Sequence, residues 1–557
     1  MPLVKNQIIP LTIDALSSDG NGVGRFEGQA VFVPFAAVGD VLSVKVVKIC
    51  KSYAFGIVES VLTPGTGRIP ADCPIFGRCG GCCFRHLSYE AELAAKQGFV
   101  ADALRRIGGL DVPVRDILPS PQTERYRNKV QYPLFLAGDG SVQAGFYASR
   151  SHRPLPCGDC LLQPGLLNRI AATLCALLTQ YHISVYDEQA HRGLARHIYL
   201  RHAVTNGSVL VCLVCNGRSL PHAQDICAAL VKAHPEVESV VLNINTHKTN
   251  VITGKECITL YGPGVLHDTM RGVPVALGPL SFYQVNTEGA NRLYSVAADF
   301  AAPGPEDTLL DLYCGAGTIG LSMAEHCGRL IGVEIVPEAV ESARRNAAAM
   351  GVEHVEFFCA DAGTAAQKLA ADGLLPNIVV LDPPRKGCDE PTLKAVLAMA
   401  PQRIVMVSCN PATAARDLKY LSQHGYAVHA VQPVDMFPRT KHVETVVLLS
   451  HKKADSYIHI DVEFGEGEGK IPVDSIAKRA EAYKPKEKVT YKMIKEYIEA
   501  KYGFKVHTAY IAEVKRNLGL PMYDAPNAVE ELKQPRKHPT PEKVEAIKDA
   551  LRYFAVI

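Results

Sequence analysis

Short strand patterns and helix patterns alternate along residues 288–450 of this 557-residue chain. Apolar runs typical of strands occur at 308–312, 329–334, 355–359, 378–382, 403–408, 426–434 and 443–450. Helical patterns separate the first six runs, whereas no helical pattern separates the last two. This alternation predicts a doubly wound, mostly parallel α/β sheet, with the last two strands paired as an antiparallel hairpin at its edge.

The remaining chain divides into three segments with different patterns, so we expect a multidomain protein. Residues 1–62 alternate short strands with glycine turns, which predicts a small OB-like β-barrel. Residues 63–285 mix strands and helices and contain a cysteine-rich loop at 73–86, which predicts an α+β central domain. Residues 286–450 would form the Rossmann-like α/β domain, and the Lys- and Glu-rich residues 451–557 a small helical extension. Helical patterns recur in that extension near 473–483, 489–502, 508–518 and 541–553.

Composition limits the class of protein. A hydrophobic content of 47% and a charged content of 21% are typical of globular proteins. The chain has no run of 18 apolar residues and no signal-peptide core at its N-terminus, so we expect a cytoplasmic protein with no membrane partner. We also expect a monomer. A net charge of +2 means that nucleic-acid binding would depend on local patches. Seventeen cysteines in a reducing compartment indicate metal or cluster ligands, a catalytic thiol, or inert buried thiols.

A glycine-rich turn, Asp311–Gly320, follows the first strand of the α/β segment. Glycines such as Gly315 allow a tight turn and let a ligand approach the backbone closely. Glu334 ends the next strand, where its carboxylate can accept hydrogen bonds from two ribose hydroxyls. This pattern fits either adenosylmethionine or NAD.

Acids after further strands favour adenosylmethionine. Asp361 follows the third strand, where it can meet the adenine, and Asp382 follows the fourth, beside the expected place of the methyl donor. Asp311 would repel a pyrophosphate but attract the ammonium group of the donor. Helix capping explains each acid equally well when it is taken alone. Four acids at the carboxyl ends of successive strands, however, indicate a cofactor site.

Cys409 directly follows the apolar strand that ends at Ser408, so its thiol can attack a ligand lying across the sheet edge. Methylation of uracil at C5 needs such a thiol, because C5 is a poor nucleophile until a thiolate has added to C6. A base must afterwards remove the C5 proton, and Glu444, at the start of the last strand, can be that base. Taken singly, Cys409 fits an inert thiol and Glu444 an exposed carboxylate. The donor site beside them favours the catalytic interpretation.

The run from Cys73 to Cys83 places at least three thiols on one tight loop, with Gly80 and Gly81 between Cys79 and Cys82. The glycines let the backbone fold back so that Cys79 and Cys82 can bind one centre. Zinc and an iron–sulfur cluster both accept four thiolates, and the spacing alone does not choose between them.

Several longer motifs resemble those of the RNA uracil-5-methyltransferase family, which includes 23S rRNA and tRNA enzymes. They are the runs 281–286, 382–387, 408–417 and 435–444. The resemblance covers about residues 1–450. It implies adenosylmethionine as the methyl donor, and it implies these roles: Cys409 as nucleophile, Glu444 as proton acceptor, and Gln284, Tyr313, Gly315, Glu334, Asp361 and Asp382 at the donor.

The same resemblance also implies roles for residues that bind the RNA and for the cysteine loop. It implies that Phe282 lines the pocket of the flipped uracil, and that the N-terminal barrel is a TRAM domain. It also implies a [4Fe–4S] cluster on the cysteine loop. The implied cluster ligands are Cys73, Cys79, Cys82 and the remote Cys160, with Cys157 as a competitor for the last position.

Arg125–Lys129 interleaves cations with Tyr126, which suits RNA phosphates and stacking but fits a solvated strand edge as well. We take Arg127 and Lys129 as candidate RNA contacts. The target base must be extruded from its stack to reach the thiol. We favour 23S rRNA, because the barrel and the cluster loop resemble the rRNA branch of the family.

Other functions stay open at this point. A tRNA enzyme or an rRNA enzyme with two target sites would share all of these motifs. Cytosine methylation would need an acid at N3, and no motif supplies one. An RNA-folding factor with incidental catalysis does not explain Cys409 and Glu444, and an iron–sulfur redox protein would need a second cofactor motif.

Overall fold

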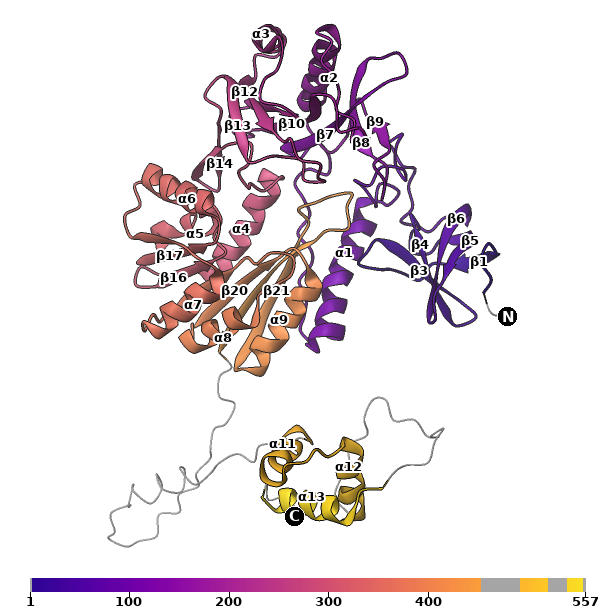
Figure 1. Cartoon of the computed structure of the whole chain (residues 1–557), viewed down its shortest axis with the longest axis vertical. Helices are drawn as coiled ribbons and strands as arrows, with labels where there is room; N and C mark the ends of the chain where they lie inside the picture. Colours follow the sequence, from indigo (N-terminus) through magenta and orange to yellow (C-terminus); the bar gives the residue numbers. More distant parts are fainter. Residues whose placement is uncertain (1–2, 452–490, 519–537, 554–557) are drawn as a thin grey trace. The chain divides into compact units, whose positions relative to one another are not determined.

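The computed structural model describes residues 3–451, 491–518 and 538–553 (Figure 1). The chain divides into two compact units, Met1–Tyr457 and Ile458–Ile557. The helix predicted near 473–483 lies outside the described residues. Within the described part of the chain, no helix is long and apolar enough to cross a membrane.

The N-terminal sheet has six strands in the order β1-β5-β6-β4-β3-β2. They are β1 (Ile8–Thr12), β2 (Ala15–Leu16), β3 (Asn21–Phe26), β4 (Gln29–Pro34), β5 (Val41–Ile49) and β6 (Tyr53–Thr63). Buried and more exposed side chains alternate along them, as in β5, where Leu42, Val44 and Val46 are buried. One face of the sheet therefore packs into a small core, and the other face lies at the surface.

A seven-stranded central sheet follows in the order β13-β12-β11-β10-β7-β8-β9. Its strands are β7 (Lys129–Leu136), β8 (Val142–Tyr147), β9 (Pro154–Pro156), β10 (Ala195–His202), β11 (Val209–Cys215), β12 (Val237–Ile244) and β13 (Glu256–Tyr261). Helices α2 (Gly165–Gln180) and α3 (Ala223–Ala233) share one core with it. The hairpin of β14 (Leu266–Met270) and β15 (Val273–Leu277) shares a second core with it. Nearly every residue of β10 and β11 is buried because both faces of the sheet are covered.

The catalytic sheet has the order β18-β17-β16-β19-β20-β22-β21. Its strands are β16 (Thr308–Leu312), β17 (Arg329–Glu334), β18 (Val355–Cys359), β19 (Ile378–Leu381), β20 (Arg403–Ser408), β21 (Tyr426–Val434) and β22 (Glu444–His451). The predicted parallel sheet and its antiparallel hairpin are confirmed, and the last strand is inserted between β20 and β21. Strand order reverses between β16 and β19, the place where sheets of this type bind ligands.

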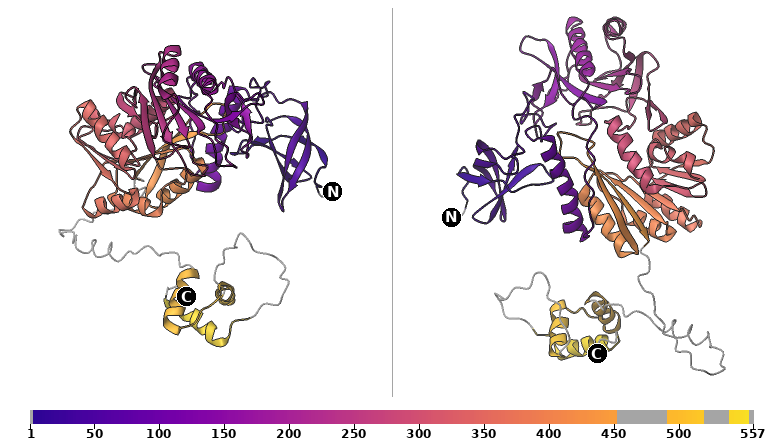
Figure 2. Two further views of the ribbon diagram at one scale, coloured as in Figure 1. Left: turned by 45° about the horizontal axis from the view of Figure 1, so that its top comes forward. Right: turned by 180° about the vertical axis from the view of Figure 1, so that it is seen from behind.

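Helices cover both faces of the catalytic sheet (Figures 1 and 2). One face shares a core with α4 (Thr287–Ala301), α5 (Thr318–Leu321) and α6 (Pro337–Met350). The other shares a core with α1 (Tyr89–Ala103), α7 (Ala362–Ala371), α8 (Glu390–Met399) and α9 (Pro411–Gln423).

Helix α1 joins this catalytic core although it precedes the sheet by about 200 residues. Ser88 caps its first turn by accepting a hydrogen bond from Ala91 N (3.2 Å). After a π-helical turn at Leu104–Gly108, the chain runs back along the sheet edge, where Leu118 pairs in parallel with Val434. The proposed subdivision of the larger unit at residues 62 and 285 stays a prediction.

The smaller unit contains helices at the positions expected from the sequence. They are α11 (Tyr491–Tyr502), α12 (Thr508–Asn517) and α13 (Pro541–Tyr553). Ile498, Ile511 and Ile547 are buried together in its core, so these helices have an apolar core of their own. The predicted helical extension is confirmed for these residues.

Candidate active site and thiol cavity

Cys409 and Glu444 lie at the same end of two paired strands. β20 and β22 are antiparallel, with Ser408 opposite Thr445. Cys409 follows Ser408 and Glu444 precedes Thr445, so the register brings the thiol and the carboxyl to neighbouring positions. Cys409 is half-buried, and Glu444 is buried. The end of β20 thus brings together the predicted nucleophile and the predicted base.

Asp382 and Arg385 complete this charged group. Asp382 directly follows β19, the neighbour of β20, and burial raises its pKa to about 7. Burial, and then the charge of Asp382, raise the pKa of Glu444 to about 8. Burial, and then Glu444, raise the pKa of the Cys409 thiol to about 11, while Arg385 opposes both of these shifts. Without a ligand, the thiol and the base are therefore both mainly protonated at neutral pH.

Asp311 is a buried acid at the switch point of the sheet. Its Oδ2 accepts a hydrogen bond from Gly320 N (3.0 Å), but its Oδ1 has no hydrogen-bond partner in the described part of the chain. Burial, and then the charge of Asp382, raise the pKa of Asp311 to about 8. Leaving a buried carboxyl oxygen unpaired costs free energy, which a cationic ligand would recover. The ammonium group of adenosylmethionine fits this requirement.

Tyr294, on α4, lies among the same groups. Its hydroxyl contacts the side chains of Thr318 and Gln284. Burial, and then the charge of Asp382, raise the pKa of Tyr294, so it stays a neutral donor. This contact places the predicted donor residue Gln284 beside the acids at the strand ends.

The glycine-rich turn is tied to the end of the next strand. Tyr313 and Gly315 have φ angles of 68° and 56°, and the left-handed region is unfavourable for a residue with a side chain such as Tyr313. Gly315 N donates to Glu334 Oε2 (3.1 Å), and Val336 N donates to Glu334 Oε1 (2.9 Å). The backbone thus fixes the Glu334 carboxylate beside the turn, where a ribose could use its remaining lone pairs.

Asp361 serves as a helix cap in the structure. Its Oδ1 accepts a hydrogen bond from Thr364 N (3.1 Å) at the start of α7. The side chain is exposed at the carboxyl end of β18. The capping role is therefore present, and contact with an adenine stays a prediction.

Phe282 projects from a well-anchored loop and is 75% exposed. Arg201 Nη2 donates to the carbonyl of Ser281 (2.6 Å), and Asn128 Nδ2 donates to the carbonyl of Gln284 (2.8 Å). Exposing a phenylalanine this far is unfavourable in water, so the side chain is available to an apolar partner such as a base.

A buried ionic network supports the loop that leads to Glu444. Lys96 Nζ donates to Glu92 Oε1 and to Asp435 Oδ1, both at 2.7 Å, and to the carbonyl of Phe437 (3.1 Å). The side chains of Lys96, Glu92 and Asp435 are all fully buried. Helix α1 is therefore bound to the loop through charges that have no access to water.

The cysteine-rich loop contacts the same catalytic loop directly. Cys83 N and Phe84 N both donate to the carbonyl of Arg439, at 3.0 and 3.1 Å. Arg439 N in turn donates to Glu92 Oε1 (2.7 Å). The N-terminal sheet adds an ion pair between Asp19 and Lys441 (2.9 Å). The thiol loop, α1 and the N-terminal sheet thus hold the segment that carries His442 and ends at Glu444.

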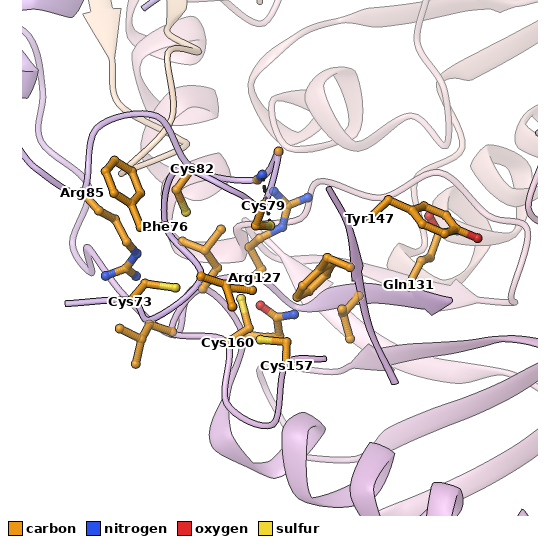
Figure 3. Close-up of a pocket in the computed structure, with 18 of the residues that line it drawn as sticks. Cys73, Phe76, Cys79, Cys82, Arg85, Arg127, Gln131, Tyr147, Cys157 and Cys160 are labelled. Atoms are coloured by element: carbon orange, nitrogen blue, oxygen red, sulfur yellow. Dashed lines mark hydrogen bonds between the residues drawn. The ribbon is translucent and has the colours of Figure 1, made fainter. Parts of the chain in front are cut away.

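Five of the chain's cysteines line one cavity of about 330 Å³ (Figure 3). Cys73, Cys79 and Cys82 come from the cysteine-rich loop, and Cys157 and Cys160 from the loop after β9. Burial raises the pKa of Cys82 to about 12, whereas a hydrogen bond from Cys157 lowers the pKa of Cys160 to about 7. The structure thus brings together all four predicted cluster ligands and the competitor Cys157.

Cations line the same cavity. Arg85, Arg127 and Lys129 belong to its wall, and Arg127 lies beside Cys79 in Figure 3. Burial, and then the charge of Arg201, lower the pKa of Lys129 to about 8. The predicted RNA contacts Arg127 and Lys129 therefore face the thiols, and thiolates at this site would meet compensating positive charge.

Tyr126 is not available for stacking. It is buried, and its hydroxyl donates to the carbonyl of Pro438 (2.9 Å). Arg125 forms an ion pair with Asp159 (2.6 Å). The expectation that the Arg125–Lys129 run offers an aromatic surface to RNA is wrong, because this tyrosine instead supports the catalytic loop.

The donor set of the cavity suits a polynuclear group. Across 3–451, 491–518 and 538–553, no three His, Cys, Asp or Glu side chains are arranged to bind a single metal ion. A [4Fe–4S] cluster has a different requirement, because each of four thiolates binds a different iron and the sulfurs lie further apart. The cavity supplies the thiols and the neighbouring cations that such a cluster needs.

The sheet order, the acids at successive strand ends and the thiol beside them define an adenosylmethionine-dependent methyltransferase. Residues 88–452 match the family described as tRNA (uracil-5-)-methyltransferase, and residues 2–58 match the TRAM domain. The chain belongs to the tRNA (uracil-5-)-methyltransferase family and is an RNA methyltransferase.

Similar proteins agree with this assignment. An uncharacterized RNA methyltransferase of Halalkalibacterium halodurans is 42% identical over 452 residues, which cover 81% of this chain and 98% of that relative. One from Clostridium tetani is 39% identical over 451 residues, with the same coverage. The crystal structure of Pyrococcus abyssi tRNA (uracil-54, C5)-methyltransferase with S-adenosyl-L-homocysteine is 26% identical, with a TM-score of 0.64. That match covers 79% of this chain and all of the Pyrococcus chain.

Two residues of the site escaped sequence analysis. Tyr294 lies within a helix whose apolar pattern gives no sign of a polar role. Arg385 belongs to the run 382–387 but was assigned no function, although its charge opposes the pKa shifts of both Cys409 and Glu444. The sequence did contain a signal for Arg385. This cation follows Asp382 by three positions, so it lies near the same edge of the sheet.

Proposed function

We propose that this chain methylates C5 of a specific uridine in 23S ribosomal RNA. The observation that carries the chemistry is the pairing of Cys409 with Glu444 at one end of two adjacent strands, beside Asp382. The Cys409 thiol gives up its proton to solvent and, as the thiolate, adds to C6 of the extruded uracil, which gives an enolate nucleophilic at C5. The positive charge of the bound donor favours the ionised form of Glu444. C5 takes the methyl group as the bond between that methyl group and the donor sulfur breaks, which leaves a neutral thioether. The Glu444 carboxylate then removes the C5 proton, and the C6–sulfur bond breaks to release the product and the Cys409 thiolate.

The donor residues have distinct proposed tasks. Asp311 and Asp382 meet the positive charges of adenosylmethionine, and their raised pKa values mean that donor binding displaces protons from them. Glu334 holds the ribose beside Gly315, while Asp361 lies near the adenine. Gln284 and Tyr313 would complete the donor site.

Glu444→Gln tests the assignment of the base. The amide cannot accept the C5 proton, so the methylated uracil should stay attached to Cys409. We expect a protein–RNA adduct that survives a denaturing gel and contains methyl groups from labelled donor. Release of methylated RNA at the normal rate would remove Glu444 from this role.

Ribosomal RNA is the favoured substrate because the TRAM domain and the thiol loop resemble the rRNA branch. A tRNA substrate is the second candidate, since the similar Pyrococcus enzyme is named for uridine 54 of tRNA. An rRNA enzyme with two target sites is a variant of the first. Purified protein with labelled donor should methylate a 23S rRNA transcript and not a tRNA transcript, and nuclease mapping by mass spectrometry then locates the base.

We further propose that Cys73, Cys79, Cys82 and Cys160 hold a [4Fe–4S] cluster. Four thiols in one cation-lined cavity support this, and Arg127 and Lys129 would balance the charge of the bound thiolates in addition to any contact with RNA. Such a cluster would join the loop at 73–83 to the loop at 157–160. Because Cys83 and Phe84 hold Arg439, the same cluster would also stabilise the loop that ends at Glu444.

The RNA must present its base unstacked. The exposed Phe282 is placed to pack on the extruded uracil, at the end of a loop that also carries Gln284. Stacking on an aromatic ring returns part of the free energy lost on unstacking. Phe282→Ala should therefore weaken RNA binding without loss of donor binding.

A further inference from the structure

The thiol cavity contains one more cysteine than the proposed cluster can use. A [4Fe–4S] cluster takes one thiolate at each of its four irons, whereas five cysteines line the cavity. When the four proposed ligands bind the cluster, Cys157 is left over. Cys157 is separated from the ligand Cys160 by only two residues, Gly158 and Asp159. This Cys-x-x-Cys spacing is typical of dithiols that open and close as a disulfide.

The thiols of Cys157 and Cys160 lie side by side. A hydrogen bond joins the two side chains, with Cys157 as the donor, and Figure 3 shows both sulfurs at the same part of the cavity wall. Both side chains are only half-buried, so a small molecule that enters the cavity can reach them. Little movement of the side chains is therefore needed to join the two sulfurs in one bond.

The loop that carries this pair is held by contacts that do not use either sulfur. Arg125 donates to both oxygens of Asp159, at 2.6 and 2.8 Å, and to the carbonyl of Cys160 (3.0 Å). Asn168 Nδ2, on α2, donates to the same carbonyl (3.2 Å). These contacts can stay in place while the two thiols form or break a bond, so the loop presents the pair in either state.

The cavity contains a second Cys-x-x-Cys pair, which is arranged differently. Cys79 and Cys82 flank two glycines, and Cys79 Sγ accepts a hydrogen bond from Gly81 N (3.4 Å). The side chains of Cys79 and Cys82 lie apart in Figure 3. Both are also proposed cluster ligands, so neither is free while a cluster is bound. Of the two pairs, only Cys157 and Cys160 combine a proposed ligand with a spare thiol.

We propose that Cys157 and Cys160 are a peroxide-sensitive dithiol, which closes into a disulfide when the cluster is lost and so protects Cys160 from irreversible oxidation. Hydrogen peroxide transfers one oxygen atom to one of the thiols, which gives a sulfenic acid and water. The sulfur of the second thiol then displaces the hydroxyl group, which leaves as water with the second thiol's proton. Two thiols and one peroxide thus give one disulfide and two waters, with the sulfurs oxidised and the peroxide reduced.

The disulfide and the cluster exclude each other. While Cys160 binds iron, its sulfur cannot pair with Cys157. Once Cys160 is part of the disulfide, only three of the proposed ligands remain for four irons. The empty site therefore needs a reductant, such as a dithiol, before it can bind iron again. This link to iron rests on the proposed cluster, whereas formation of the disulfide does not.

Peptide mapping of the full-length protein, purified without air, tests the pair. Hydrogen peroxide is added in slight excess until no more iron is released, and free thiols are then alkylated. We expect the peptide with Cys157 and Cys160 to carry no alkyl group and to be lighter by two hydrogen atoms. Dithiothreitol should restore both thiols and, with ferrous iron and sulfide, the original iron content. Free thiols at both positions would overturn the proposal, as would a disulfide between Cys79 and Cys82 in their place.

Cys157→Ser separates protection of the site from iron binding. Serine cannot form the disulfide, but all four proposed ligands remain, so the untreated variant should contain as much iron as the unmodified chain. After peroxide treatment, Cys160 should carry two added oxygens as a sulfinic acid, which dithiothreitol does not reduce. Iron uptake after reduction should then be largely lost.

Cys83→Ser is the matched control, because Cys83 belongs to the cysteine-rich loop but does not line the cavity. This variant should form the disulfide and recover its iron like the unmodified chain. Full recovery by Cys157→Ser would contradict the protective role. Loss of iron from Cys157→Ser before any treatment would do so as well, since Cys157 would then be a ligand.

Iron content and disulfide formation report on different proposals, and neither depends on methylation. A chain that holds no iron as purified but forms the disulfide with peroxide loses the proposed cluster and keeps the redox-active pair. A chain that holds iron and forms no disulfide after losing it loses the pair alone.

Discussion

The methyl-transfer site and the thiol cavity are assembled in opposite ways. Cys409, Asp382 and Glu444 come from the ends of adjacent strands of one sheet, so the strand register fixes their neighbourhood. The cavity instead closes between two loops, at 73–82 and 157–160, that no shared sheet aligns. A site at strand ends can be anticipated from local patterns, whereas a site between loops depends on the packing of the domains that carry them.

Their electrostatics differ as well. The methyl-transfer site gathers acids whose pKa values are raised, with Arg385 as the cation that opposes the shift of Glu444. The thiol cavity gathers potential thiolates with Arg85, Arg127 and Lys129 on the same wall. The first arrangement attracts a cationic ligand, and the second neutralises charge that arises within it. The segment from Asp435 to Glu444 connects the two sites.

The largest effect should come from Cys409→Ala. The methyl-transfer site has no other thiol at that strand end, so the addition to C6 cannot occur and methylated RNA should fall below detection. The measurement is incorporation of labelled methyl groups into RNA. Cys257→Ala, an exposed thiol on β13, should keep full activity. Residual turnover by Cys409→Ala would mean that the site does not act through this nucleophile.

Lys96→Met tests the connection between the two regions. The change leaves Glu92 and Asp435 as buried carboxylates without their cation, so the free energy of unfolding should fall by about 3–5 kcal/mol. Urea unfolding followed by circular dichroism measures this. Lys394→Met, which breaks an exposed pair with Glu390, should leave the free energy of unfolding nearly unchanged. Equal losses in the two variants would contradict a structural role for the buried network.

Cys73→Ser tests whether the thiol cavity influences the methyl-transfer site. Loss of one ligand should release iron, and the less constrained loop should misplace Glu444, which lowers the methylation rate roughly ten- to hundredfold. Iron content and single-turnover methylation are measured on the same preparation. Cys83→Ser, in the same loop, should retain both. An iron-free protein that methylates at the normal rate would show that the two sites are independent.

The smallest effect should be a pH dependence of donor binding. Asp382 and Asp311 have pKa values raised to about 7 and about 8, so below these values they bind protons that a cationic donor must displace. Affinity for adenosylmethionine should therefore increase as the pH rises through 7 and 8 and then become constant. Calorimetry in buffers of different ionisation enthalpy measures the released protons. Asp382→Asn should reduce the dependence, and affinity independent of pH would contradict the proposed charge pairing.

Much of the catalytic half followed from local sequence. Alternating strands and helices predicted the sheet, and the position of Cys409 directly after an apolar strand predicted an exposed edge for the thiol. The run Arg125–Lys129 shows where such reasoning failed. Its pattern suited an RNA surface, but Tyr126 is buried against Pro438 and Lys129 faces the thiols. Whether a polar strand residue faces solvent or a neighbouring domain depends on tertiary contacts, which the local sequence does not reveal.

Position along the chain was also a poor guide to the packing of α1. This helix precedes the catalytic sheet by about 200 residues, yet Val100 and Leu104 lie in the same core as Leu310 and Leu418. The helix has little amphipathic pattern, because its buried residues include Glu92 and Lys96 beside Phe99 and Val100, so its sequence does not specify a partner. The burial of Lys96 is explained only by the tertiary structure, which places Asp435 beside it.

The sequence by itself determined the strands, the acids at their ends, and the chemistry that a thiol and a carboxylate can perform there. These features depend on interactions between residues close in the chain or on the fixed register of a sheet. The tertiary structure decided that Cys157 and Cys160 meet the thiol loop, that Tyr294 joins the donor site, and that the thiol loop holds the segment before Glu444. Those contacts join residues far apart in the chain, and only packing between domains sets their distances.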